Sequence, residues 1–96
     1  MSKLSELVES RRDELVASAE RHRASNLRLF GSVAEGTDDG DSDIDFLVDF
    51  APGATLLDLA DLKDEFEEIL GRSVDVLSSR ALKPRDEDIR RQAVPL

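Results

Sequence analysis

The fold is decided by the stretch from Leu29 to Phe50, which reads LFGSVAEGTDDGDSDIDFLVDF. Its second half alternates as a strand does, with Ile44, Phe46, Val48 and Phe50 on one face and Asp43, Asp45, Leu47 and Asp49 on the other. The segment Gly36 to Ser42 holds only residue types that favour turns. Before it, Asn26 to Phe30 predicts a first strand that ends in a turn at Gly31 and Ser32. The stretch therefore predicts two strands joined by a polar connection.

Helices and one more strand are expected on either side of this stretch. Helical spacing of apolar residues predicts an amphipathic helix from Lys3 to about Arg23. Thr55, with Asp58 three residues later, is typical of a helix start, and Gly71 is typical of a helix end. Ser73 to Leu77 predicts a third strand, and Pro84 opens a short last helix. We expect a single domain over residues 1–96 of the α/β (α+β) class, with a small mixed sheet flanked by helices.

The negative charge of the chain is concentrated in one region. The net charge is −9, and no Lys or Arg lies between Leu29 and Leu62. That region holds nine acids, namely Glu35, Asp38, Asp39, Asp41, Asp43, Asp45, Asp49, Asp58 and Asp61. Such a region repels nucleic acid and anionic membrane but attracts divalent cations. A solvated acidic face, as in salt-adapted proteins, is the alternative interpretation.

The composition also indicates where the protein works. No apolar stretch approaches the ~20 residues of a membrane helix, and the mixed charges of the N-terminus do not resemble a secretory signal. The absence of cysteine fits a reducing compartment. We expect a cytoplasmic protein that binds neither membrane nor nucleic acid directly.

Three acids stand on predicted strands, where charged residues are uncommon. Asp43 and Asp45 point the same way from one strand, and Asp75 joins them if the third strand pairs beside the second. Clustered carboxylates repel one another unless a cation lies between them, and Mg²⁺ prefers such hard oxygen ligands. The pattern predicts a magnesium site, with two ions expected and Mn²⁺ as an alternative, suited to phosphoryl transfer. A backbone N–H of the Gly31-Ser32 turn and the serine hydroxyl could hold phosphate oxygens.

Gly31-Ser32, ten further residues, and then Asp43-Ile44-Asp45 resemble the signature of the polymerase-beta-like nucleotidyltransferase superfamily. The run Leu29 to Phe50 is most similar to its minimal nucleotidyltransferase (MNT) branch, the antitoxins of HEPN-type RNase toxins. The resemblance implies that Asp43 and Asp45 bind both metals, that Asp75 is the third carboxylate, and that Gly31 and Ser32 hold the triphosphate of ATP. It also implies transfer of AMP to a hydroxyl of the toxin, a tyrosine by analogy, within a hetero-oligomer.

One departure from the family pattern supports a second hypothesis. Glu35 stands where the family often has a basic residue, and an acid at that position would repel the phosphates. The alternative is therefore an antitoxin that neutralises its partner by binding only. The role of Asp75, as metal ligand, as base or as both, stays open at this stage.

Overall fold

The alternating stretch forms the centre of a four-stranded mixed sheet. The structure is a computed structural model and describes residues 3–37, 39 and 43–96. The strands are β1 (Ala24–Phe30), β2 (Ile44–Phe50), β3 (Val74–Ser78) and β4 (Val94–Pro95), in the spatial order β3-β2-β1-β4. β1 runs antiparallel to both β2 and β4, whereas β3 runs parallel to β2. The predicted mixed sheet and its fold class are confirmed.

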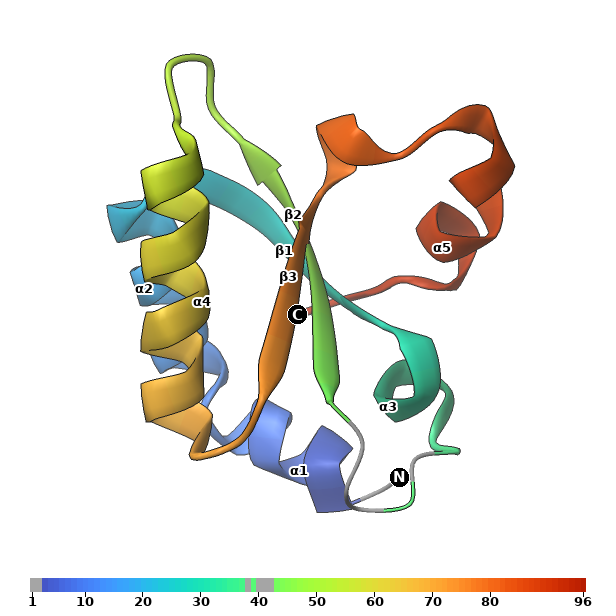
Figure 1. Ribbon diagram of the computed structural model, residues 1–96. Helices are drawn as coiled ribbons and strands as arrows, with labels where there is room; N and C mark the ends of the chain where they lie inside the picture. The colour runs from blue at the N-terminus through green and yellow to red at the C-terminus, as the bar shows by residue number, and fades with distance from the viewer. Residues whose placement is uncertain (1–2, 38, 40–42) are drawn as a thin grey trace.

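Helices cover both faces of this sheet. Figure 1 shows α2 (Arg12–Arg21) and α4 (Leu56–Leu70) side by side on one face, with α1 (Lys3–Ser10) below them. The opposite face carries α3 (Gly31–Glu35) and α5 (Glu87–Gln92), together with the short 3-10 turns η1 (Ser79–Ala81) and η2 (Pro84–Asp86). None of the described helices is long and apolar enough to cross a membrane.

The hydrophobic core lies between the sheet and the α2–α4 layer. Ile44, Phe46 and Val48 of β2 are fully buried there, as the alternation predicts. Phe46 meets Phe66 of α4 edge to face, with ring centroids 4.9 Å apart. Aromatic pairs in this geometry add about 0.5–1.5 kcal/mol to the burial of their surface. The apolar face of β2 therefore fixes how α4 lies across the sheet.

The predicted start and end of α4 are confirmed. The carboxylate of Asp58 accepts a hydrogen bond from the backbone N–H of Thr55 at 2.9 Å, which satisfies a donor that the helix leaves unpaired. Gly71 follows the last turn with a φ of +66°, the left-handed conformation that a glycine adopts at little cost.

The N-terminal helix and the segment after the first strand differ from their predictions. The expected helix from Lys3 to Arg23 is two helices, because the chain turns at Arg11, whose N–H bonds to the carbonyl of Val8 at 3.1 Å. Apolar periodicity continues through this bend, so the sequence pattern does not reveal it. The predicted Gly31-Ser32 turn is the start of α3 instead. Part of the predicted turn over 36–42 lies outside the described residues.

The second face of β2 is also more apolar than its sequence pattern suggests. Leu47, which alternation places among the aspartates, is fully buried because α3 and η1 pack against that side of β2. The C-terminal β4, which no sequence signal indicated, pairs Val94 with Leu29 at the edge of β1. This face of β2 is therefore covered at Leu47, whereas Asp45 and Asp49 on either side of it are half-buried.

An ionic cluster joins α2 to α4, the two helices that cover one face of the sheet. The carboxylate of Glu65 accepts a hydrogen bond from the guanidinium of Arg21 and contacts Nε2 of His22. The bonds to His22 and Arg21 lower the pKa of Glu65 to about 2. His22 is only 17% exposed, so the single histidine of the chain has a structural role between the two helices.

We predict that Glu65→Gln destabilises the protein by about 1 kcal/mol at neutral pH, a modest value because the cluster lies near water. The lowered pKa means that the ionic contribution is present above pH 4.5, the usual pKa of the side chain, and is lost as the pH falls towards about 2. Urea denaturation at a series of pH values measures this. A stability difference between the two proteins that stays constant from pH 7 to pH 2.5 would contradict the assigned role of Glu65.

Candidate active site

The structure brings two of the three predicted acids side by side. Asp45 of β2 and Asp75 of β3 are register partners on neighbouring parallel strands. Neighbouring strands lie about 4.8 Å apart, and register partners point to the same face of the sheet. Asp43 comes directly before β2 and is exposed. The third strand does pair beside the second, which is the condition under which Asp75 was expected to join Asp45.

The Gly31-Ser32 pair lies against the same carboxylate group. Phe30, the last residue of β1, is the register partner of Asp45, so the next residue begins α3 beside this aspartate. A Cβ atom added to Gly31 would lie 2.5 Å from Oδ2 of Asp45, closer than real Cβ contacts come. Gly31 also has a φ of +77°, which disfavours any side chain. The residue at position 31 must therefore be glycine for the Asp45 carboxylate to stay where it is.

The pKa of Asp45 shows how the acids affect each other. Burial raises this pKa above its usual range, and the charges of Asp75 and Asp43 raise it further. Within the described residues, none of these three carboxylates forms an ion pair with Lys or Arg. The site is consequently an uncompensated negative cluster, and a cation would relieve its repulsion.

A further acid of β2, Asp49, has its charge compensated by a base. Burial acts to raise the pKa of Asp49, but hydrogen bonds from Ser79 and Asn26 and the charge of Arg28 outweigh it and lower the pKa. Nη2 of Arg28 lies 2.6 Å from Oδ1 of Asp49. Sequence reasoning missed this pair. The available signal was a single base on the first strand and an acid on the next strand along the chain.

The donor set suits a hard divalent cation, although the side chains do not converge on one point. Among the described residues, no group of three or more Asp, Glu, His or Cys side chains is close enough to hold a metal ion as it stands. Carboxylates on neighbouring strands beside a glycine that leaves them room are nevertheless the oxygen ligands that Mg²⁺ takes. The residues present therefore fit magnesium in chemistry, and the metal assignment stays a prediction.

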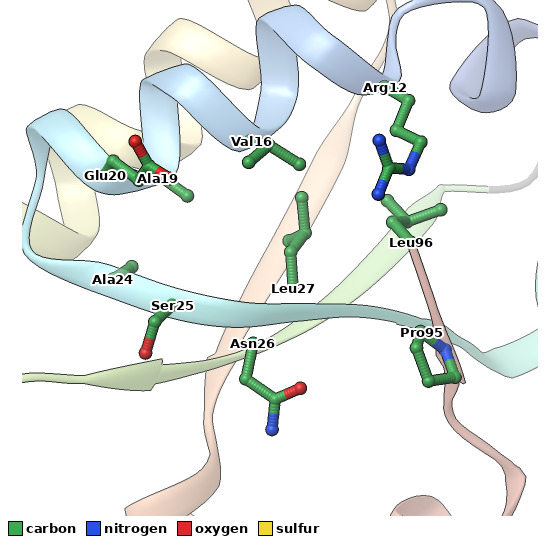
Figure 2. A pocket seen from close by; sticks show the side chains of 10 residues that line it. All are labelled: Arg12, Val16, Ala19, Glu20, Ala24, Ser25, Asn26, Leu27, Pro95 and Leu96. Atoms are coloured by element: carbon green, nitrogen blue, oxygen red, sulfur yellow. The ribbon is translucent and has the colours of Figure 1, made fainter.

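A separate hollow lies away from these acids. Figure 2 shows it between α2 and the start of β1, where Val16 and Leu27 point towards one another and Asn26 points away from α2. Its volume is about 200 Å³, and Asp43, Asp45 and Asp75 do not line it. This hollow is not part of the acidic site.

Comparison with known families gives a match over most of the chain. The family model for the "Nucleotidyltransferase domain" matches residues 7–94 of the chain. A curated relative, "Putative protein adenylyltransferase MJ0435" of Methanocaldococcus jannaschii, is 44% identical over 68 residues, which cover 71% of this chain and 73% of the relative.

Solved structures give the same result over the full length. A structure described as a "putative minimal nucleotidyltransferase" is 45% identical, covers 100% of this chain and 97% of its own, and superposes with a TM-score of 0.87. A structure described as a "toxin-antitoxin with AMP-PNP" has a TM-score of 0.73 at 21% identity, covering 86% of this chain and 69% of its own. At that identity the second likeness shows the fold alone.

We predict that Gly31→Ala destabilises the protein by about 1–3 kcal/mol, because the positive φ strains any side chain and the new methyl group forces the Asp45 carboxylate to rotate away. Gly36→Ala is the matched control. Gly36 has a φ of +75° but has nothing within 4 Å of an added Cβ, so that variant should lose only about 1 kcal/mol. Thermal melting of both variants measures the difference. Equal losses would show that the close approach to Asp45 does not matter.

We also predict that Asp45→Asn raises Tm by about 2–4 °C at neutral pH in the presence of a chelator. Removing one of three like charges relieves roughly 0.5 kcal/mol of repulsion, which produces a shift of this size in a domain of this length. A raised pKa means that the wild type regains this stability by protonation as the pH falls through the pKa of Asp45. The advantage of the variant should therefore shrink towards pH 4, and an advantage that grows on acidification would overturn the electrostatic account.

Proposed function

Because the chain belongs to the nucleotidyltransferase domain family, we propose that it transfers AMP from ATP to a hydroxyl group of a protein partner. The observation that carries this proposal is the contact of Gly31 with the Asp45 carboxylate, which joins the two halves of the family motif in one place. Asp75 stands beside Asp45 on the neighbouring strand. A nucleotide held at Gly31 would therefore have its phosphates next to the acidic cluster.

The three carboxylates would hold the metal. Asp43 and Asp45 would ligate two Mg²⁺ or Mn²⁺ ions, with Asp75 as the third carboxylate, serving as ligand, as base or as both. Bound metal supplies charge neutralisation for the phosphates and for the group that leaves. Strand positions suit this role, because β2 and β3 are fixed by the core on the opposite face of the sheet.

Gly31 and Ser32 would hold the triphosphate of ATP. The missing side chain at Gly31 lets the backbone approach phosphate closely, and the half-buried Ser32 offers a hydroxyl beside it. In the reaction, the acceptor oxygen bonds to the α-phosphorus while the bond to pyrophosphate breaks, and the hydroxyl proton passes to a base at the site. Orientation of these groups supplies most of what phosphoryl transfer requires of a protein.

The acceptor is proposed to be a HEPN-type RNase toxin, modified on a tyrosine. Two observations support a protein acceptor: the relative from M. jannaschii is named as a protein adenylyltransferase, and a structure with this fold is described as a toxin-antitoxin. The uncompensated acids disfavour nucleic acid as the acceptor. AMP on the toxin would add negative charge near its RNA-binding surface and silence it.

A second candidate function is neutralisation by binding only. Glu35 favours it, because this exposed acid lies in the last position of α3, a few residues from Gly31 and Ser32. A negative charge there weakens the hold on a triphosphate unless metal compensates it. The two candidates differ in one measurable respect, which is whether the partner gains mass.

We predict that a purified HEPN-type RNase toxin gains one or more AMP units when incubated with this protein, ATP and Mg²⁺. Asp43→Asn should lower the rate by at least about 10³-fold, because it removes a metal ligand on which transition-state charge depends. Intact-mass spectrometry of the partner follows the reaction.

The controls are excess chelator, which should stop transfer, and Asp49→Asn, which alters a neighbouring acid that Arg28 already compensates. Asp49→Asn should keep transfer within about tenfold of the wild type. A partner that is silenced without any gain in mass would support the binding-only function and remove the enzymatic one.

A further inference from the structure

The first turn of α4 exposes two leucines to solvent. Leu56 is 81% exposed and Leu57 is 74% exposed, and among the described residues they are the two most exposed large hydrophobic side chains. Beside them lies a hollow of about 230 Å³, whose lining is apolar at Phe50, Ala51, Ala54, Leu56 and Leu59 and polar at Thr55, Ser78 and Arg80. Single exposed leucines are ordinary, but two adjacent ones at the edge of a partly apolar hollow form a patch. We call Leu56, Leu57 and this hollow the leucine patch.

A row of acids continues from the leucine patch along the outer side of α4. Asp61, Asp64 and Glu68 are exposed and follow Leu57 by four, seven and eleven residues, the spacing of one helix face. We call these three residues the acid stripe. From Leu57 to Glu68 the face is roughly 17 Å long, at 1.5 Å per residue.

Nothing in the described part of the chain uses this face. The core side of α4 consists of Leu62, Phe66 and Leu70, which are buried. The acid stripe takes part in no ion pair among the described residues, and Lys63, the single base in α4, pairs with Glu67 at 3.4 Å. The stability of the fold therefore does not explain why leucines and acids occupy these positions.

We propose that the leucine patch and the acid stripe form the docking surface for the protein that receives the nucleotide. The inference rests on the proposed function and adds the chemistry of the partner. That partner carries an apolar socket for Leu57 and a row of Lys or Arg side chains about one helical turn apart. An amphipathic helix face recognises a groove in this way, with the apolar anchors giving affinity and the charges giving orientation.

Charge decides between a basic partner and a second copy of this chain. A second copy would bring the same acid stripe and the same net charge of −9 to the contact. An RNA-cleaving protein has a basic surface, since it binds phosphates, and it therefore matches the stripe. An anionic membrane is disfavoured by the same acids.

The docking surface is separate from the reacting groups. Figure 1 shows α4 on the face of the sheet opposite α3, and the helix begins at the end of the sheet away from α3, whereas Asp43 precedes the opposite end of β2. The acid stripe runs along α4 towards that opposite end but stays on the other face of the sheet. Contacts made there bind the acceptor equally before and during the reaction. They should consequently change KM for the acceptor and leave kcat unchanged.

The test compares two variants with matched controls, using the HEPN-type RNase of the proposed function as probe. Leu56→Ser with Leu57→Ser removes the anchors, and Val94→Ser is the control for an exposed aliphatic residue. Asp61→Lys with Asp64→Lys reverses the stripe, and Glu9→Lys with Asp13→Lys makes the same charge change at exposed positions of α1 and α2. All are exposed residues, so the variants should stay folded.

Binding is measured by calorimetry in the Asp45→Asn background without ATP, so that no transfer is needed. We expect the leucine variant to weaken Kd at least about tenfold and the stripe variant to weaken it by a similar factor, more strongly at low salt. Each control should stay within about twofold. In the background that retains Asp45, KM for the RNase should rise by the same factors with kcat unchanged.

Two results overturn the docking proposal. One is unchanged affinity of the leucine variant for the RNase, and the other is a concentration-dependent dimer of the wild type, seen by sedimentation, that the leucine variant loses. The proposed function fails differently: the wild type would then bind the RNase through this face but leave its mass unchanged.

Discussion

The close approach of Gly31 to the Asp45 carboxylate is the constraint on which the site depends. It follows from the β1–β2 register, which pairs Phe30 with Asp45 and so places the next residue directly beside that side chain. A shift of one residue in this register would turn Asp45 towards the core and Ile44 towards α3. The apolar residues Ile44, Phe46 and Val48 prevent such a shift, because they must face α2 and α4. The hydrophobic core therefore fixes the position of the acids as well as the fold.

The bases of the protein matter as much as its acids for the character of the site. Asp49 stands on the same strand as Asp45, yet Arg28 lies across from it and compensates its charge. Asp45 and Asp75 have no such partner among the described residues. The charge of β2 therefore changes from compensated at Asp49 to uncompensated at Asp45, four residues away. An enzyme that collects cations at one point needs this contrast, since a uniformly acidic surface would hold them diffusely.

Much of this arrangement is predictable from residue patterns, and the exceptions have physical reasons. Alternation over 44–50 predicted β2, the Thr55 and Asp58 pair predicted the start of α4, and both are confirmed. The bend at Arg11 was missed because helical periodicity runs through it without a Gly or Pro. The burial of Leu47 was missed because it depends on α3 and η1, which arrive from other parts of the chain. The structure places Asp75 beside Asp45, as the sequence pattern required for a triad, whereas the site assignment and its metal and phosphate roles remain predictions.

One face of the sheet packs the hydrophobic core and the other carries the acidic cluster. This separation explains how an unfavourable charge cluster persists in a small domain. The face towards α2 and α4 holds the aromatic pair of Phe46 and Phe66 and is secured at its edge by Glu65, Arg21 and His22. Those contacts stabilise the backbone of β2 whatever the opposite face carries. Repulsion among Asp43, Asp45 and Asp75 acts on the same backbone, but strands held by a packed core cannot move apart to relieve it. The remaining ways to relieve it are protonation, which the raised pKa of Asp45 already indicates, and a bound cation. The second of these is the metal site that we propose at this end of β2.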